Sequence, residues 1–175
     1  MRILVTAFEP YGGNDTNISQ RVLDAIQADL AKLLLPVSFR RAPEVLNEAI
    51  KQFQPEVIIS MGQAAEGDKI RLERLAINMM DSAKGDNDGY VPDEEMICPG
   101  VALALKTALP VKSLCAECIN AGLPTIVSNS AGLYVCNRIY FEALRHNLNS
   151  LFVHIPKNMN LEIAKQVINQ IIKFF

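Results

Sequence analysis

A strand, a turn and a helix follow one another in residues 124–145, which read PTIVSNSAGLYVCNRIYFEALR. The short apolar run at 124–127 is typical of a buried strand, and residues 138–145 have the spacing of a helix. Between them, small residues form a turn, and Cys136 falls near the first turn of the helix. A thiol there would lie at the positive end of the helix dipole, which favours the reactive thiolate. Taken alone, the stretch leaves open the more common alternative of a buried, inert cysteine.

The composition indicates one globular domain spanning residues 1–175. Half of the residues are hydrophobic (50%), 21% are charged and the net charge is −2, which is typical of a domain with one sizeable core. The sequence has no basic stripe, so we do not expect nucleic acid as a partner. No apolar run approaches the roughly 18 residues of a membrane helix, and Met1-Arg2 leads straight into an apolar run too short for a signal peptide. We therefore expect a cytoplasmic protein that contacts neither nucleic acid nor membrane.

Strands and helices alternate along the rest of the chain. We expect strands at 2–7, 34–39, 57–61, 69–78, 124–127 and 151–153, and helices starting near Ser19, at Pro43, and over 111–121, 138–145 and 161–175. The first helix would bury a stripe that runs from Val22 to Leu33. Residues 81–100 form a long polar loop, and 101–109 is ambiguous between helix and strand. The alternation predicts a three-layer α/β/α fold with a twisted, mostly parallel or mixed sheet and helices on both faces.

In such sheets, ligands bind beyond the carboxyl ends of the strands. Phe8, Gln63, the turn from Ser128 to Cys136, and His154 each follow a predicted strand. We therefore expect these residues to gather at one edge of the sheet.

The predicted strand at 69–78 has a fault in its alternation. Ile70 and Leu72 share one face, whereas Leu75 and Ile77 share the other, and the changeover falls at Glu73-Arg74. A carboxylate in the middle of a strand is costly to bury unless it is paired. The pattern alone favours a surface Arg–Glu pair, and a functional carboxylate is the alternative.

Two patterns resemble metal or redox sites. Cys115 and Cys118 match C-x-x-C, but no second ligand pair has the spacing of a zinc site, so we interpret them as one side of an amphipathic helix. All four cysteines are expected to be thiols. Residues 86–89, DNDG, resemble half of a calcium loop that has Lys84 at its first ligand position. We predict neither a metal nor a cofactor.

A cysteine, a histidine and a carboxylate together suggest a thiol hydrolase. Lowering the thiol pKa from about 8.5 by about two units requires about 2.7 kcal/mol, and a helix terminus offers only about 0.3–1 kcal/mol. A neighbouring imidazolium must therefore supply much of the rest. His154, at a strand end, is a better candidate than His146, which lies at the polar end of a helix. Glu73 is the candidate carboxylate that orients the imidazole.

Several segments together resemble the pyroglutamyl peptidase type I (pyrrolidone carboxyl peptidase) family. These segments are VTAFEPYGG at 5–13, GQA at 62–64, LERLAIN at 72–78 with DNDGY at 86–90, SAGLYVCN at 130–137 and FVHIP at 152–156. The resemblance implies a cysteine exopeptidase that removes an N-terminal pyroglutamate from peptides through a thioester. Its catalytic triad falls on Glu73, Cys136 and His154. Its pocket implies apolar walls at Phe8, Tyr11, Tyr134 and Val135, and polar positions at Asn17 and Gln63.

The chain departs from the family pattern at several positions. Ala7 stands at a usual glycine, Tyr11 at a phenylalanine, Ile18 at a proline and Ala83 at a loop arginine, and the chain is shortened around 34–36, before 151 and between 156 and 161. The family relationship allows a homo-oligomer, a dimer or a tetramer. Two alternatives stay open: a non-catalytic homologue that binds the lactam without turnover, and a different hydrolase or nucleosidase on a similar scaffold.

Overall fold

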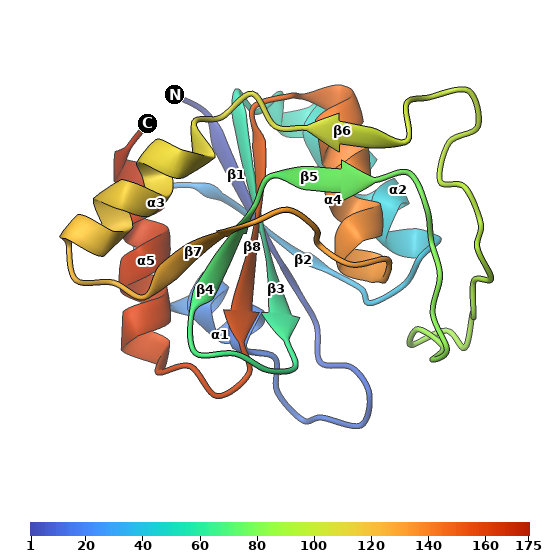
Figure 1. Cartoon of the computed structure of the whole chain (residues 1–175), viewed down its shortest axis with the longest axis horizontal. Helices are drawn as coiled ribbons and strands as arrows, with labels where there is room; N and C mark the ends of the chain where they lie inside the picture. Colours follow the sequence, from blue (N-terminus) through green and yellow to red (C-terminus); the bar gives the residue numbers. More distant parts are fainter.

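A six-stranded sheet lies between two layers of helices in the computed structural model, which describes residues 1–175 (Figure 1). The strand order is β2-β1-β3-β8-β4-β7. The strands are β1 (Ile3–Phe8), β2 (Ala31–Leu35), β3 (Val57–Ala64), β4 (Ile70–Glu73), β7 (Thr125–Ser128) and β8 (Ser150–Pro156). Strands β1, β2, β3 and β8 are parallel, whereas β4 pairs antiparallel with β8 and parallel with β7. The predicted mostly parallel, mixed sheet is confirmed.

Helices cover both faces of this sheet. They are α1 (Ile18–Ala25), α2 (Arg41–Phe53), α3 (Val111–Asn120), α4 (Val135–His146) and α5 (Leu161–Lys173). The core under α1, α3 and α5 includes Val5 and Ala7 of β1, and the core under α2 and α4 includes Leu4 and Phe8. Successive side chains of β1 thus pack into the cores on opposite faces of the sheet, which explains why β1 is apolar throughout.

The fault at Glu73-Arg74 marks a change of sheet. Strand β4 ends at Glu73, and β5 (Leu75–Ile77) pairs antiparallel with β6 (Ala104–Lys106) in a separate two-stranded sheet near α4 (Figure 1). The prediction of one strand over 69–78 is therefore wrong. Ile70 and Leu72 are buried in the main sheet, whereas in β5 Ala76 is buried and Leu75 and Ile77 are half-buried. Strand β6 also resolves the ambiguous segment at 101–109.

The prediction was also wrong between α1 and α2. Helix α1 ends at Ala25, and the second strand is 31–35 rather than 34–39. Leu33 and Leu35 pair with Thr6 and Phe8 of β1, so sheet pairing overrides the helical spacing of these leucines. The N-cap is Asn17 rather than Ser19, since the Asn17 side chain accepts the Ser19 N–H. Helix α2 does have Pro43 in its first turn, as predicted.

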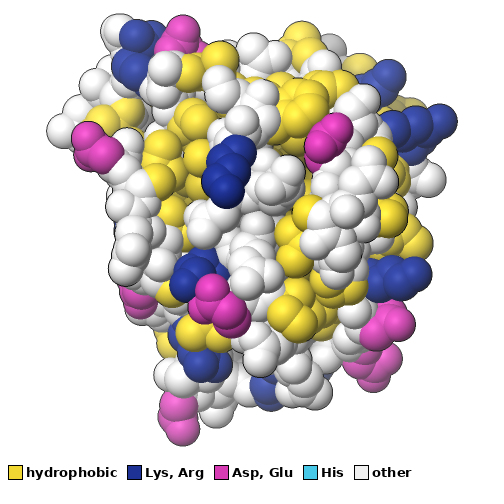
Figure 2. All heavy atoms as spheres, turned by 90° about the vertical axis from the view of Figure 1, so that its left-hand side faces the viewer, with side chains coloured by type: hydrophobic (Ala, Val, Ile, Leu, Met, Phe, Trp, Pro, Cys, Tyr) yellow, Lys and Arg dark blue, Asp and Glu magenta, His cyan; other side chains and the backbone are white.

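Figure 2 shows the face formed by α3 and α5, where hydrophobic patches are interrupted by charged side chains of both signs. Beneath it, Cys115 and Cys118 are buried on the inner side of α3 and are free thiols, like the other two cysteines. The interpretation of C-x-x-C as one side of an amphipathic helix is confirmed. No helix is long and apolar enough to cross a lipid bilayer.

Candidate active site

A cavity of about 530 Å³ opens at the edge of the sheet where β1, β3 and β8 end. Its lining includes the six predicted pocket residues and two of the three predicted catalytic residues: Phe8, Tyr11, Asn17, Gln63, Tyr134, Val135, Cys136 and His154. The predicted gathering at one edge is therefore confirmed. For Cys136 the reason differs, because β7 runs opposite to β8. The connection from Ser128 to Tyr134, rather than the strand direction, brings the start of α4 to the cavity.

Glu73 lies beneath the cavity and contacts the imidazole of His154. The Glu73 side chain is 0% exposed, and its Oε1 lies 2.9 Å from His154 Nδ1. The expected surface Arg–Glu pair is wrong, because β4 is an inner strand and Glu73 points to the same face as His154. A carboxylate at Nδ1 requires a proton on Nδ1, which leaves Nε2 as the basic nitrogen. The other oxygen, Oε2, is buried without a partner.

Cys136 is the second residue of α4, and its neighbours fix its position. Asn137 Oδ1 accepts the Ile77 N–H, and its Nδ2 donates to Ile77 O and Met79 O, which ties the first turn of α4 to β5. Gly62 of β3 lies directly against the thiol, since a Cβ there would stand 2.7 Å from Cys136 Sγ. Gly132, with φ of +79°, makes the left-handed turn that precedes α4.

The protonation state of Cys136 differs from the sequence-based expectation. Burial, followed by the negative charge of Glu73, raises the pKa of the Cys136 thiol to about 12. The direction is opposite to the expected lowering, because the half-buried thiol is largely removed from water and a carboxylate lies near it. No hydrogen bond joins Cys136 Sγ to His154. The thiol of the resting site thus carries its proton.

The walls of the cavity are aromatic and apolar. The ring centroids of Tyr11 and Tyr134 lie 6.2 Å apart, and Phe39 packs edge-on against Tyr134 at 5.2 Å. Gln63 Oε1 accepts the Ile18 N–H, which directs Nε2 toward the cavity. Asn17 is engaged at both ends of its amide, because Nδ2 donates to Glu9 O and Oδ1 accepts from Ser19. Gln63 also interacts with the hydroxyl of Tyr11, a neighbouring cavity residue.

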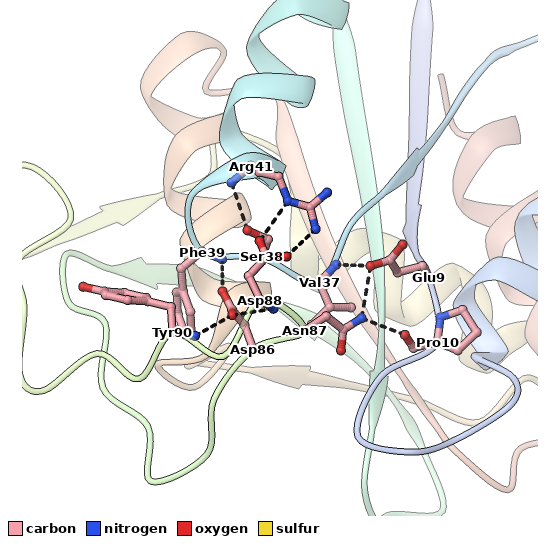
Figure 3. Close-up of polar contacts among 10 residues, drawn as sticks. All are labelled: Glu9, Pro10, Val37, Ser38, Phe39, Arg41, Asp86, Asn87, Asp88 and Tyr90. Carbon is pink, nitrogen blue, oxygen red and sulfur yellow. Dashed lines mark hydrogen bonds and ion pairs between the residues drawn. The ribbon is translucent and has the colours of Figure 1, made fainter.

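A network that we name the loop clasp, residues 86–90 with 9–10 and 37–41, holds this wall (Figure 3). Asp86 Oδ1 accepts the N–H groups of Asp88 and Tyr90, and Oδ2 accepts the N–H of Phe39. Asn87 Nδ2 donates to Glu9 Oε1 and Pro10 O. The carboxylates that resembled a calcium loop are therefore engaged by the protein. Because the Tyr134 hydroxyl donates to Gly85 O, the clasp connects to the cavity wall.

Comparison with known proteins gives the family. Residues 1–171 match the model for Pyroglutamyl peptidase.

The chain belongs to the pyroglutamyl peptidase family.

A pyrrolidone-carboxylate peptidase of Pyrococcus furiosus is 36% identical, covering 98% of this chain and 86% of that protein. The enzyme of Lactobacillus helveticus is 38% identical over 89% of this chain and 84% of its own length. The crystal structure of the Thermus thermophilus enzyme superposes with a TM-score of 0.93 at 31% identity, covering 99% of this chain and 100% of that one. The fold and the family expected from the sequence are thus confirmed.

Several cavity residues of this chain were not predicted from the sequence. Val37 lies in a loop, whereas a strand was expected there. Ser128 and Ser130 were expected at this edge as part of the turn, but they were not among the predicted pocket residues. Arg71 was missed although it stands two residues before Glu73, so the period of a strand places both on one face. That spacing could have identified it.

Proposed function

We propose that this chain is a cysteine omega-peptidase that hydrolyses the bond after an N-terminal pyroglutamate. The observation that carries the proposal is the buried Glu73–His154 pair, 2.9 Å between Oε1 and Nδ1, in the same site as Cys136. A buried carboxylate with a single imidazole hydrogen bond is suited to holding one tautomer and stabilising an imidazolium. Family membership supports the same substrate class.

Pyroglutamate is a flat, neutral lactam, so its pocket needs apolar walls and few polar groups. Phe8, Tyr11, Tyr134 and Val135 supply such walls. Gln63 lines the cavity beside Tyr11, and its Nε2 can donate to the lactam carbonyl. Asn17 then acts indirectly, by holding the loop after β1 against α1.

The thiol of Cys136 attacks the pyroglutamyl carbonyl, and His154 Nε2 takes its proton during the attack. Transfer during the attack follows from the raised pKa of the thiol, about 12, which keeps the free thiol protonated. Glu73 stabilises the imidazolium that forms. His154 then gives the proton to the leaving amine, a thioester remains, and water hydrolyses it with His154 acting again as base.

Backbone N–H groups at the start of α4 can stabilise the oxyanion. The first intrahelical hydrogen bond runs from Arg138 N–H to Tyr134 O, so the N–H groups of Val135, Cys136 and Asn137 have no helical acceptor. No side chain caps this end of the helix. Free N–H groups at a helix N-terminus favour a developing negative charge beside the nucleophile.

Hydrolysis of a pyroglutamyl aminomethylcoumarin amide tests the proposal. Cys136→Ala is expected to lower kcat/KM by about 10⁴-fold or more, as for loss of a nucleophile. Cys98→Ala is the matched control, because Cys98 is a partly buried thiol that does not line the cavity. Turnover by Cys136→Ala at the wild-type rate would rule the proposal out.

The alternative is a homologue that binds the lactam without turnover. The observation in its favour is that Cys136 Sγ makes no hydrogen bond to His154 in the free site. Calorimetry with pyroglutamyl-alanine amide, run beside the coumarin assay, separates the two functions. Binding of this peptide by the wild-type chain without hydrolysis would favour the binding protein.

A further inference from the structure

Arg71 is the only aspartate, glutamate, lysine or arginine among the 16 residues that line the cavity. It lies on β4, and its side chain is 38% exposed. A single positive charge among lining residues that are apolar or polar and uncharged restricts what can bind beside it.

The guanidinium of Arg71 is largely unengaged. Its one charged contact is from Nε to Glu73 Oε1 at 3.5 Å, which is longer than a good hydrogen bond. The Glu73 oxygen in that contact is already bonded to His154. The two terminal nitrogens of Arg71 donate to no group of the protein, so they keep their capacity to bind a carboxylate in the bidentate manner.

The position of Arg71 assigns it to one end of the substrate. Arg71 is the direct cross-strand partner of His154, so the two side chains lie next to each other on the same face. In the proposed reaction His154 gives a proton to the leaving amine. A group beside His154 therefore faces the residue that follows pyroglutamate, whereas the neutral lactam lies between the aromatic walls.

We propose that Arg71 is a specificity-determining residue that binds a carboxylate in the residue after pyroglutamate. The inference rests on the proposed function and adds its substrate class: pyroglutamyl dipeptides, whose free α-carboxylate follows the scissile bond directly. An acidic side chain in that residue presents the same chemistry. Peptides that lack both carboxylates leave the guanidinium unpaired.

Three substrates separate the two sources of carboxylate: pyroglutamyl-alanine, pyroglutamyl-alanine amide and pyroglutamyl-glutamate amide. For the wild type, kcat/KM is expected to be about tenfold higher for pyroglutamyl-alanine than for its amide, the size of one charge-assisted contact at a partly exposed site. Arg71→Gln should reduce this ratio to within about twofold, and Arg71→Lys should retain part of it. The glutamate amide shows whether a side-chain carboxylate can substitute.

The matched control is Arg74→Gln, because Arg74 lies three residues further along and does not line the cavity. It should leave the acid-to-amide ratio at the wild-type value. If Arg71→Gln instead slows all three substrates by the same factor, Arg71 acts only on the charge of Glu73 and the proposal is wrong.

Binding to the Cys136→Ala variant tests the inference without turnover. By calorimetry, pyroglutamyl-alanine should bind this variant about tenfold more tightly than its amide does, and Cys136→Ala/Arg71→Gln should bind both equally. Equal Kd values in the single variant would overturn the role of Arg71 even if the peptidase is active. A preserved difference would support that role even if turnover were absent.

Discussion

Two buried carboxylates near the cavity differ in how fully they are hydrogen-bonded. Asp86, in the loop clasp, accepts three backbone N–H groups and uses both of its oxygens. Glu73, beneath the cavity, accepts one close hydrogen bond, from His154, and its Oε2 has no partner. Asp86 is 8% exposed and Glu73 is 0% exposed, so the less satisfied carboxylate is also the more deeply buried one.

This difference in hydrogen bonding distinguishes a carboxylate with a structural role, Asp86, from one suited to catalysis, Glu73. A carboxylate that is saturated by backbone donors fixes loops and has little capacity left to respond to a new charge. A carboxylate with unused capacity is costly to bury, and a fold retains it where a positive charge develops nearby. By this reasoning the loop clasp determines the shape of the cavity, whereas the Glu73–His154 pair determines its reactivity.

Breaking the reactive pair should have the largest effect. His154→Ala should lower kcat for the coumarin substrate by about 10³-fold or more, and Glu73→Gln by about 10²-fold, because Glu73 acts only through the imidazole. His146→Ala is the matched control, since His146 is 41% exposed at the end of α4 and contacts Glu142. If Glu73→Gln keeps the wild-type kcat, the contrast drawn between the two carboxylates is wrong.

Disturbing the contact between Gly62 and the Cys136 thiol should have the second-largest effect. In Gly62→Ala, the new Cβ would stand 2.7 Å from Cys136 Sγ and 2.8 Å from Phe152 Cζ. The thiol must move, and we expect kcat/KM to fall by about 10²-fold, since small misplacements of reacting groups can cost that much. Overpacking should also lower the free energy of unfolding by about 1–3 kcal/mol. Urea denaturation measured beside kinetics checks both, and unchanged kinetics would show that the thiol can shift freely.

Breaking the loop clasp should have a smaller effect on catalysis and a distinct signature. Asp86→Ala leaves the N–H groups of Phe39, Asp88 and Tyr90 without their acceptor, so the free energy of unfolding should fall by about 2–4 kcal/mol. Because Phe39 packs on Tyr134, KM should rise several-fold while kcat changes less. Asp88→Ala, which removes an exposed ion pair with Arg41, should destabilise the fold less. A fall in kcat with KM unchanged would contradict the division between shape and reactivity.

The sequence predicted the reactive pair better than the loop clasp. Each of the three residues Cys136, His154 and Glu73 stands within or directly beside a predicted strand or helix. Their placement therefore follows from the layer architecture. Glu73 was detectable because a charge interrupts an apolar strand pattern. The reversed direction of β4 and β7 was not detectable, since residue patterns give strand faces and not strand polarity.

The loop clasp could not be predicted because its bonds join segments far apart in the chain. Asp86 bonds to Phe39, and Asn87 bonds to Glu9 and Pro10, across separations that no local pattern encodes. For this reason the local pattern DNDG at 86–89 resembled only half of a calcium loop. The raised pKa of Cys136 depends on burial and on the charge of Glu73, and Gly62 of a distant strand lies against the thiol. The position of the cysteine at the start of a helix does not predict either contact.

The loop clasp and the active site should affect the free energy of unfolding at opposite ends of the pH range. Hydrogen bonds from Arg41, then Ser38, lower the pKa of Asp88 in the loop clasp from 3.8 to about 2. A lowered carboxyl pKa stabilises the fold above its ordinary value, and this stability is lost as the pH falls from about 4 toward 2. The pKa of Cys136 is raised from 9.0 to about 12 by burial and Glu73, so its contribution is lost as the pH rises above about 9.

Unfolding free energies measured from pH 2 to pH 10 should therefore show two separable limbs. Asp88→Asn should make the acid limb slightly less steep and leave the alkaline limb unchanged, because Asp88 is exposed and the pKa values of Glu56 and Glu142 are lowered as well. Cys136→Ala should flatten only the alkaline limb, by about 1 kcal/mol between pH 8.5 and 10, because the unfolded thiol ionises there and the folded thiol does not. If Cys136→Ala keeps the wild-type alkaline slope, the thiol of the folded enzyme already ionises there. The folded thiol would then have an ordinary pKa, and burial beside Glu73 would not control its ionisation.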